Sequence, residues 1–159
     1  MNISIIQAAP EHAKDIARIC STGWRQTVQG KYSEAYQTQN VQYWYNHKRV
    51  LEDIDKGIYT YVAIADQIIA GTIGGVVTNQ GVSHIYVFYV DDEYRYKGIG
   101  TKLLHALTKN HLERGATDQC ASVEEGNKLG IPFYEARGFR RKSQSKRYWR
   151  PITNDHFYK

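Results

Sequence analysis

The hydrophobic pattern of the first third of the chain predicts two helices. Between residues 8 and 24, apolar side chains return every three or four positions, as on one face of a helix; they are Ala13, Ile16, Ala17 and Cys20. Pro10 followed by Glu11 suits a first helical turn. We predict a second helix from about Ser33 through Lys48, although the many tyrosines and tryptophans of this stretch blur its period.

Three extended runs follow. Between residues 58 and 77, two β-branched segments flank the polar pair Asp66-Gln67, which predicts a hairpin. Glycines in the second segment indicate bulges or places where another backbone comes close; they are Gly71, Gly74 and Gly75. After a turn at residues 79–81, residues 82–90 are largely apolar or aromatic on both sides. That pattern is typical of the central strand of a sheet.

Strands and helices alternate in the second half of the chain. The pattern predicts, in order, a helix over residues 99–114, a strand over 117–123, a helix over 128–137 and strands over 139–142 and 147–152. Because no linker, repeat or low-complexity tract interrupts the chain, we expect one domain over residues 1–159. The order predicts the α+β (mixed α/β) class, with one largely antiparallel sheet covered by helices.

The composition is that of an ordered globular protein. The 159 residues are 42% hydrophobic and 13% aromatic and carry a formal charge of +5, which supports a real core in one domain. The sequence shows neither a signal-peptide core nor an apolar run of 18 residues, and its cysteines, Cys20 and Cys120, lack disulfide, zinc or redox spacing. We expect a cytoplasmic protein that contacts no membrane.

The histidines do not predict a metal site. They show no tight ligand spacing, and His105 and His111 would point to different sides of one helix. The six are His12, His47, His84, His105, His111 and His156.

The turn between residues 95 and 100 is the strongest candidate for chemistry. Gly98 and Gly100 lie between an extended run and a helix, where glycine lets the backbone turn tightly and approach a ligand. Free N–H groups at a helix N-terminus bind anions, and Arg95 and Lys97 add positive charge. The spacing matches neither the dinucleotide fingerprint nor the nucleotide P-loop. We therefore expect a pyrophosphate site of another kind.

This segment resembles the signature of the GNAT-type N-acetyltransferases, Arg/Gln-x-x-Gly-x-Gly/Ala between the fourth strand and the third helix. Residues 88–100 are similar to it throughout, and a second family block follows at residues 127–139 as Asn-x-x-Gly-x-x-Phe-Tyr-x-x-x-Gly-Phe. The resemblance implies a twisted mixed sheet flanked by about four helices, acetyl-CoA as cosubstrate and transfer of acetyl to a primary amine by direct attack. Dimers are frequent in this family, so a homodimer is a further expectation.

The resemblance also implies roles for single residues. Tyr134 would be the general acid that protonates or stabilises the departing thiolate, and the backbone N–H of Val90 would polarise the thioester carbonyl. Phe88, Tyr89 and Val90 would hold the pantetheine arm, which Asn127 would contact further along, and Phe133 would pack against the cofactor or the sheet. The pyrophosphate would be bound by the turn and its flanks: Arg95, Tyr96, Lys97, Gly98, Ile99, Gly100 and Thr101.

The general base is open at this stage. Some members of the family place a glutamate where this chain has Ser122, whereas others place an acid or histidine where it has His84. Histidine titrates in the required range. Glu124 and Glu125 lie near the second block and compete with His84, and a water chain without a dedicated base is a further alternative.

The sequence says less about the acceptor and the partners than about the cosubstrate. The family builds its acceptor pocket from the first two helices and the loop between them, which implies Trp24 and Tyr32, together with Tyr36, Trp44 and Tyr45, unless these aromatics fill the core. Two alternative functions stay open. The basic run over residues 140–150 is compatible with an RNA-directed acetyltransferase that uses charged tRNA. The second alternative is a non-catalytic acyl-CoA-binding module. We expect a small-molecule or peptide amine as acceptor and no nucleic acid.

Overall fold

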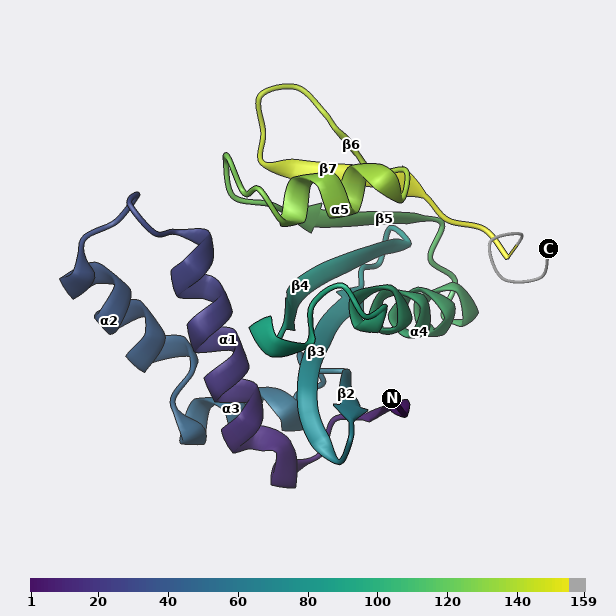
Figure 1. The fold of residues 1–159 in the computed structure, drawn as a ribbon. Coiled ribbons are helices and arrows are strands. Elements are labelled where there is room, and N and C mark those ends of the chain that lie inside the picture. The colour runs from purple at the N-terminus through teal and green to yellow at the C-terminus, as the bar shows by residue number, and fades with distance from the viewer. Residues whose placement is uncertain (155–159) are drawn as a thin grey trace.

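The computed structural model describes residues 1–154 and consists of one mixed sheet with helices on both faces (Figure 1). The sheet has seven strands in the order β1-β2-β3-β4-β5-β7-β6, and its only parallel pair among the described residues is β4 with β5. Two apolar clusters cover its two faces, one beneath α1 and α3 and the other beneath α4 and α5. The expected class, α+β with a largely antiparallel sheet, is confirmed, and residues 1–154 form five α-helices where about four were expected.

The first third of the chain differs from its prediction in two places. It contains β1 (Ile3–Gln7), a 3-10 turn (Pro10–His12), α1 (Ala13–Thr27), α2 (Glu34–Trp44) and α3 (His47–Asp55). The edge strand β1 was not predicted, because five residues are too few for a clear period. The single helix predicted over 33–48 is wrong: α2 ends at Trp44, and the Asn46 side chain accepts a bond from the Arg49 N–H at 2.8 Å to start α3.

The predicted hairpin is confirmed as β2 (Tyr61–Ala65) and β3 (Ile68–Val77). Asp66 and Gln67 both have positive φ, 52° and 69°, as the two central residues of a type I′ hairpin turn require. The expected close approach is found at Gly74, where a Cβ atom would lie 1.7 Å from the Ile58 carbonyl oxygen.

The remaining elements lie close to their predicted bounds. They are β4 (Val82–Val90), the 3-10 turn Asp92–Tyr94, α4 (Ile99–Glu113), β5 (Asp118–Ser122), α5 (Gly130–Ala136), β6 (Arg140–Arg141) and β7 (Arg147–Pro151). β4 is the fourth of seven strands, so its predicted central position is confirmed. Cys20 and Cys120 are both buried free thiols.

A bulge in β4 decides which of its side chains face which helices. Gly74 pairs with Val87 and Gly75 pairs with Ile85, so Tyr86 is an extra residue on β4. Ile85 and Phe88 consequently pack in the cluster beneath α4 and α5, whereas Val87 packs beneath α1 and α3.

β4 and β5 separate beyond the bulge. Their parallel pairing runs from Val82 with Asp118 to Ile85 with Ala121 and stops there, although β4 continues to Val90. Within the described part of the chain, the last five residues of β4 therefore have a pairing strand on the β3 side alone. Their other side faces the space into which α5 projects its aromatic residues.

Candidate active site

The turn before α4 has the backbone conformation that an anion site requires. Gly98, the residue before the helix, has φ +85° and offers no side-chain cap to the first turn, and Tyr96 has φ +63°. The N–H groups of the first turn of α4 are therefore not covered by a capping side chain. Tyr96 itself projects into solvent with 91% of its surface exposed. These residues fit a polyanionic ligand held by backbone amides.

The cations around this turn are not all those expected from the sequence. Lys97 is exposed beside it, but the Arg95 guanidinium is turned toward Asp92, at 2.7 Å, and toward Gln26 on α1. Arg137, which sequence reasoning missed, donates to the Thr101 hydroxyl in the first turn of α4 at 2.7 Å. Its place at the end of α5, far from the turn in sequence, gives no local signal.

The open side of β4 presents two backbone N–H groups. The Asp91 N–H donates to the Ala70 carbonyl on β3 at 2.8 Å, and in an antiparallel ladder the direction of the backbone groups alternates. The N–H groups of Phe88 and Val90 therefore point away from β3, toward the space from which β5 has separated. Tyr89 has the opposite direction and pairs with Thr72.

Tyr134 lies at this opening. Its ring, 8% exposed, is 6.3 Å from the Phe88 ring and 5.0 Å from the Phe139 ring. Burial raises the pKa of the Tyr134 hydroxyl well above its ordinary value, and the charge of Arg150 opposes part of that rise. The hydroxyl is therefore protonated at neutral pH.

The other two residues expected from the second block, Asn127 and Phe133, lie at the start of α5 and over the turn before α4. The Asn127 side-chain oxygen accepts from the Gly130 N–H at 2.8 Å and from the Leu129 N–H at 3.1 Å, so it starts α5. Phe133 lies over the turn, where a Cβ on Gly100 would come within 3.3 Å of its ring. The two family blocks thus meet in space at α4 and α5.

Of the candidate bases, His84 has the protonation state that a general base requires. It is half-buried on β4, with its ring 4.9 Å from that of Tyr86, and burial lowers its pKa, aided by the charge of Arg147. At neutral pH it is therefore neutral and able to accept a proton. Glu124 is paired with Lys146 at 3.1 Å, and Glu125 with Arg141 at 3.0 Å.

The aromatic residues expected around the acceptor separate into two groups. Trp24, Tyr32 and Tyr36 come together, with ring centroids 5.0–6.5 Å apart, where α1 ends and α2 begins. Two others lie elsewhere: Trp44 stacks beneath Arg49, and Tyr45 is part of the packing beneath α1 and α3. α1 lies close to β4 because residue 23 is glycine, whose Cβ would be 2.3 Å from the Tyr89 ring.

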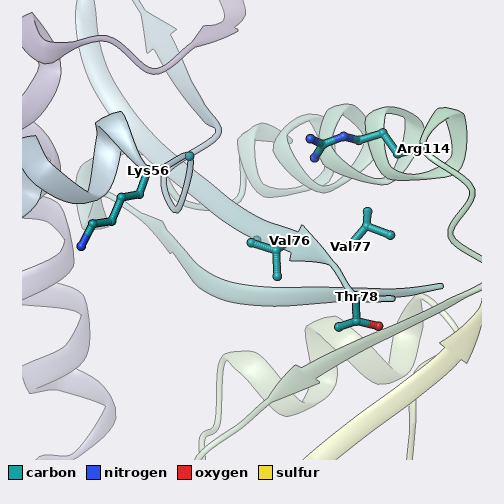
Figure 2. Close-up of a pocket in the computed structure, with 7 residues that line it drawn as sticks. Lys56, Val76, Val77, Thr78 and Arg114 are labelled. Carbon is teal, nitrogen blue, oxygen red and sulfur yellow. The ribbon is translucent and has the colours of Figure 1, made fainter. Parts of the chain in front are cut away.

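A cavity of about 380 Å³ lies at the other end of the sheet and belongs to none of these groups. Lys56 and Arg114 flank the end of β3, where Val76, Val77 and Thr78 also line the cavity (Figure 2). Within residues 1–154, no three His, Cys, Asp or Glu side chains are grouped as metal ligands, and His156 lies outside the described residues. No described helix combines the length and the apolar character needed to cross a bilayer.

Comparisons with known proteins agree with this fold. N-alpha-acetyltransferase 30 of Schizosaccharomyces pombe is 26% identical over 147 residues, which are 92% of this chain and 90% of that protein. The crystal structure of PaiA N-acetyltransferase from Thermoplasma acidophilum in complex with coenzyme A has a TM-score of 0.86 at 22% identity, over 96% of this chain and 100% of that one. Ard1 from Thermoplasma volcanium has a TM-score of 0.68 at 19% identity, over 96% and 99%.

The sequence model of the acetyltransferase (GNAT) family matches residues 21–139, which include both motifs and the elements that carry them. The chain therefore belongs to the acetyltransferase (GNAT) family and is an acetyl-CoA-dependent N-acetyltransferase.

Proposed function

We propose that the protein transfers acetyl from acetyl-CoA to the primary amine of a small molecule or peptide by direct attack, with Tyr134 acting on the leaving sulfur. The observation that carries this proposal is the position of Tyr134, which is buried on α5 with its ring 6.3 Å from Phe88 on the open side of β4. Acetyl-CoA supplies the activated thioester. The uncapped turn of α4 would hold its pyrophosphate.

The Tyr134 hydroxyl would stabilise the leaving thiolate by donating a hydrogen bond. Thiols have pKa values near 8.5, whereas the pKa of Tyr134 is raised by burial. Complete transfer of the phenolic proton to the thiolate is therefore uphill, and a short charge-assisted hydrogen bond is the better description. The N–H groups of Phe88 and Val90 are the available donors for the carbonyl oxygen.

His84, directly or through water, would take the proton of the attacking amine. Its lowered pKa keeps it neutral at physiological pH, as a base must be. Because Tyr86 is bulged, His84 lies three ladder positions before Phe88 on β4, about 10 Å along a strand, so we propose that water connects it with the amine. Glu124 and Glu125 are weaker candidates because each carboxylate already has a cationic partner.

The aromatic group of Trp24, Tyr32 and Tyr36 would bind the acceptor, since partly exposed rings suit the apolar body of an amine or a cation above a ring face. No observation favours a nucleic acid. In the basic run, Arg141 and Lys146 pair with glutamates, and Arg150 is turned inward.

The test is thiol release from acetyl-CoA with a panel of primary amines: a peptide with a free amino terminus, a lysine peptide, a polyamine and free amino acids. Tyr134→Phe should lower kcat roughly 10²-fold and leave the affinity for acetyl-CoA nearly unchanged. Tyr59→Phe, at a buried tyrosine on the opposite face, is the matched control and should keep its activity. Wild-type turnover in Tyr134→Phe would remove Tyr134 from the mechanism.

A further inference from the structure

Arg150 differs from the rest of the basic run to which it belongs. The other members are exposed, namely Arg140, Arg141, Lys142, Lys146 and Arg147. The Arg150 side chain instead turns into the protein from β7, and burial lowers its pKa to about 10. Since that value is well above neutral pH, the group is a half-buried, charged guanidinium. A buried charge is costly unless it is fully bonded, which makes its partners informative.

The guanidinium bonds to three elements at once. It donates to the Gln119 side-chain oxygen on β5 at 2.9 Å, to the Arg137 carbonyl at the end of α5 at 2.9 Å and to the Thr108 hydroxyl on α4 at 3.3 Å. It also lies over the Phe139 ring, 4.5 Å from the centroid. Arginine is suited to such a site because its planar fork presents several fixed donors.

The partners of Arg150 are themselves fixed. The Gln119 amide donates to the Ser83 hydroxyl at 3.1 Å, and that hydroxyl lies 2.6 Å from Nδ1 of His111. Gln119, Ser83 and His111 are all buried. The guanidinium is therefore held by a polar network that runs beneath α4, and not by mobile surface groups.

α5 depends on contacts at both of its ends. It has seven residues, too few for a stable helix on its own. Asn127 bonds the N–H groups at its start, and Arg150 bonds the carbonyl of Arg137 just after its last residue. The Phe139 ring contacts both residues: the Arg150 guanidinium lies over it, and the Tyr134 ring packs against it with the two centroids 5.0 Å apart.

We propose that Arg150 is a positioning residue for Tyr134, holding the end of α5 and the Phe139 ring so that the tyrosine hydroxyl stays at the opening of β4. This inference rests on the proposed function of Tyr134. Arg150 itself touches no reacting group; it acts through Tyr134.

A double-mutant cycle tests the proposal, with acetyl-CoA and the best amine of the panel. Arg150→Met should lower kcat roughly 10- to 100-fold, as expected for a displaced catalytic group, with little change in KM for acetyl-CoA. In the Tyr134→Phe background the same substitution should have almost no further effect on kcat. Equal losses in both backgrounds, or an unchanged kcat, would overturn the proposal. If Tyr134→Phe alone keeps wild-type kcat, the proposed function fails instead.

Arg140→Met is the matched control. Arg140 also donates to two carbonyls near the end of α5, those of Glu135 and Phe139, but from the surface. Its loss should change kcat less than twofold, and a loss equal to that of Arg150→Met would contradict a specific role for Arg150.

Two further measurements cover the case in which Arg150→Met does not fold. Arg150→Lys retains the positive charge but lacks the planar guanidinium with its several donors, so it should show the same loss of kcat. A wild-type kcat in this variant would refute the proposal that the guanidinium bonds position Tyr134. In Arg150→Lys, amide hydrogens of residues 131–137 should exchange faster than in the wild type, a readout that needs no acceptor. Unchanged exchange there would also refute the proposal.

Discussion

His111 should make the stability of the protein fall steeply with acidification. The side chain is fully buried on α4, its Nε2 atom has no hydrogen-bond partner among residues 1–154, and burial lowers its pKa from 6.5 to about 4. The unfolded chain therefore takes up the proton before the folded chain does, and stability is lost as pH falls below about 6.5. With a pKa of about 6.5 in the unfolded chain and about 4 in the folded chain, proton linkage lowers the free energy of unfolding by about 2 kcal/mol at pH 5 and by about 3.4 kcal/mol well below pH 4.

The measurement is thermal or urea unfolding of the wild type and His111→Asn between pH 8 and pH 5. Asparagine keeps an acceptor for Ser83 but does not titrate. The wild type should lose about 2 kcal/mol more than the variant over this range, or roughly 4–8 °C in Tm for a domain of this size. Because other titrating groups are common to both proteins, their contributions cancel. Parallel pH curves for the two proteins would refute the assignment of the pH dependence to His111.

Two predictions concern the ligand sites. Gly98→Ala places a side chain at φ +85° and should cost about 1–2 kcal/mol; it should also reduce the rise in Tm with saturating acetyl-CoA, which for the wild type should be some 5–10 °C. An undiminished rise would mean that the turn does not bind the cosubstrate. Trp24→Ala should raise KM for the acceptor and leave the rise in Tm with acetyl-CoA unchanged. Tyr43→Ala, at an exposed aromatic residue farther along α2, should change neither KM nor the rise in Tm. Equal KM values for the two variants would exclude Trp24 from the acceptor site.

Local signals predicted the parts of the site that are local in sequence. The glycine turn of residues 95–100 depends on neighbouring residues, so its residue types indicate its conformation. The hairpin turn at residues 66–67 was predictable for the same reason. The break between α2 and α3 was missed, because the capping role of Asn46 competes with continuation of a helix rich in aromatics.

Interactions between distant segments were not predictable. Arg137 reaches Thr101 and Arg150 reaches Thr108 across the fold, and nothing in the run of basic residues distinguishes the inward Arg150 from its exposed neighbours. The glycines of β3 indicated a bulge, and the register shifts between Gly74 and Gly75. The extra residue itself, Tyr86, lies on β4 and was not predicted, since a strand that is apolar on both sides shows no change of period.

That bulge determines which side chains of β4 reach the chemistry. If Tyr86 were paired in a regular ladder, the alternation of side chains would continue unbroken from Ile85, and Phe88 and Tyr89 would exchange faces. A phenol would then stand beside Tyr134, and the backbone N–H groups on the open side would belong to different residues. Deletion of Tyr86 would remove the bulge and leave Val87, Phe88 and Tyr89 on their present faces, whereas loss of one residue after the bulge would move the residues that follow to the other face. The tolerance of β4 to a change of length therefore depends on which side of Tyr86 the change falls.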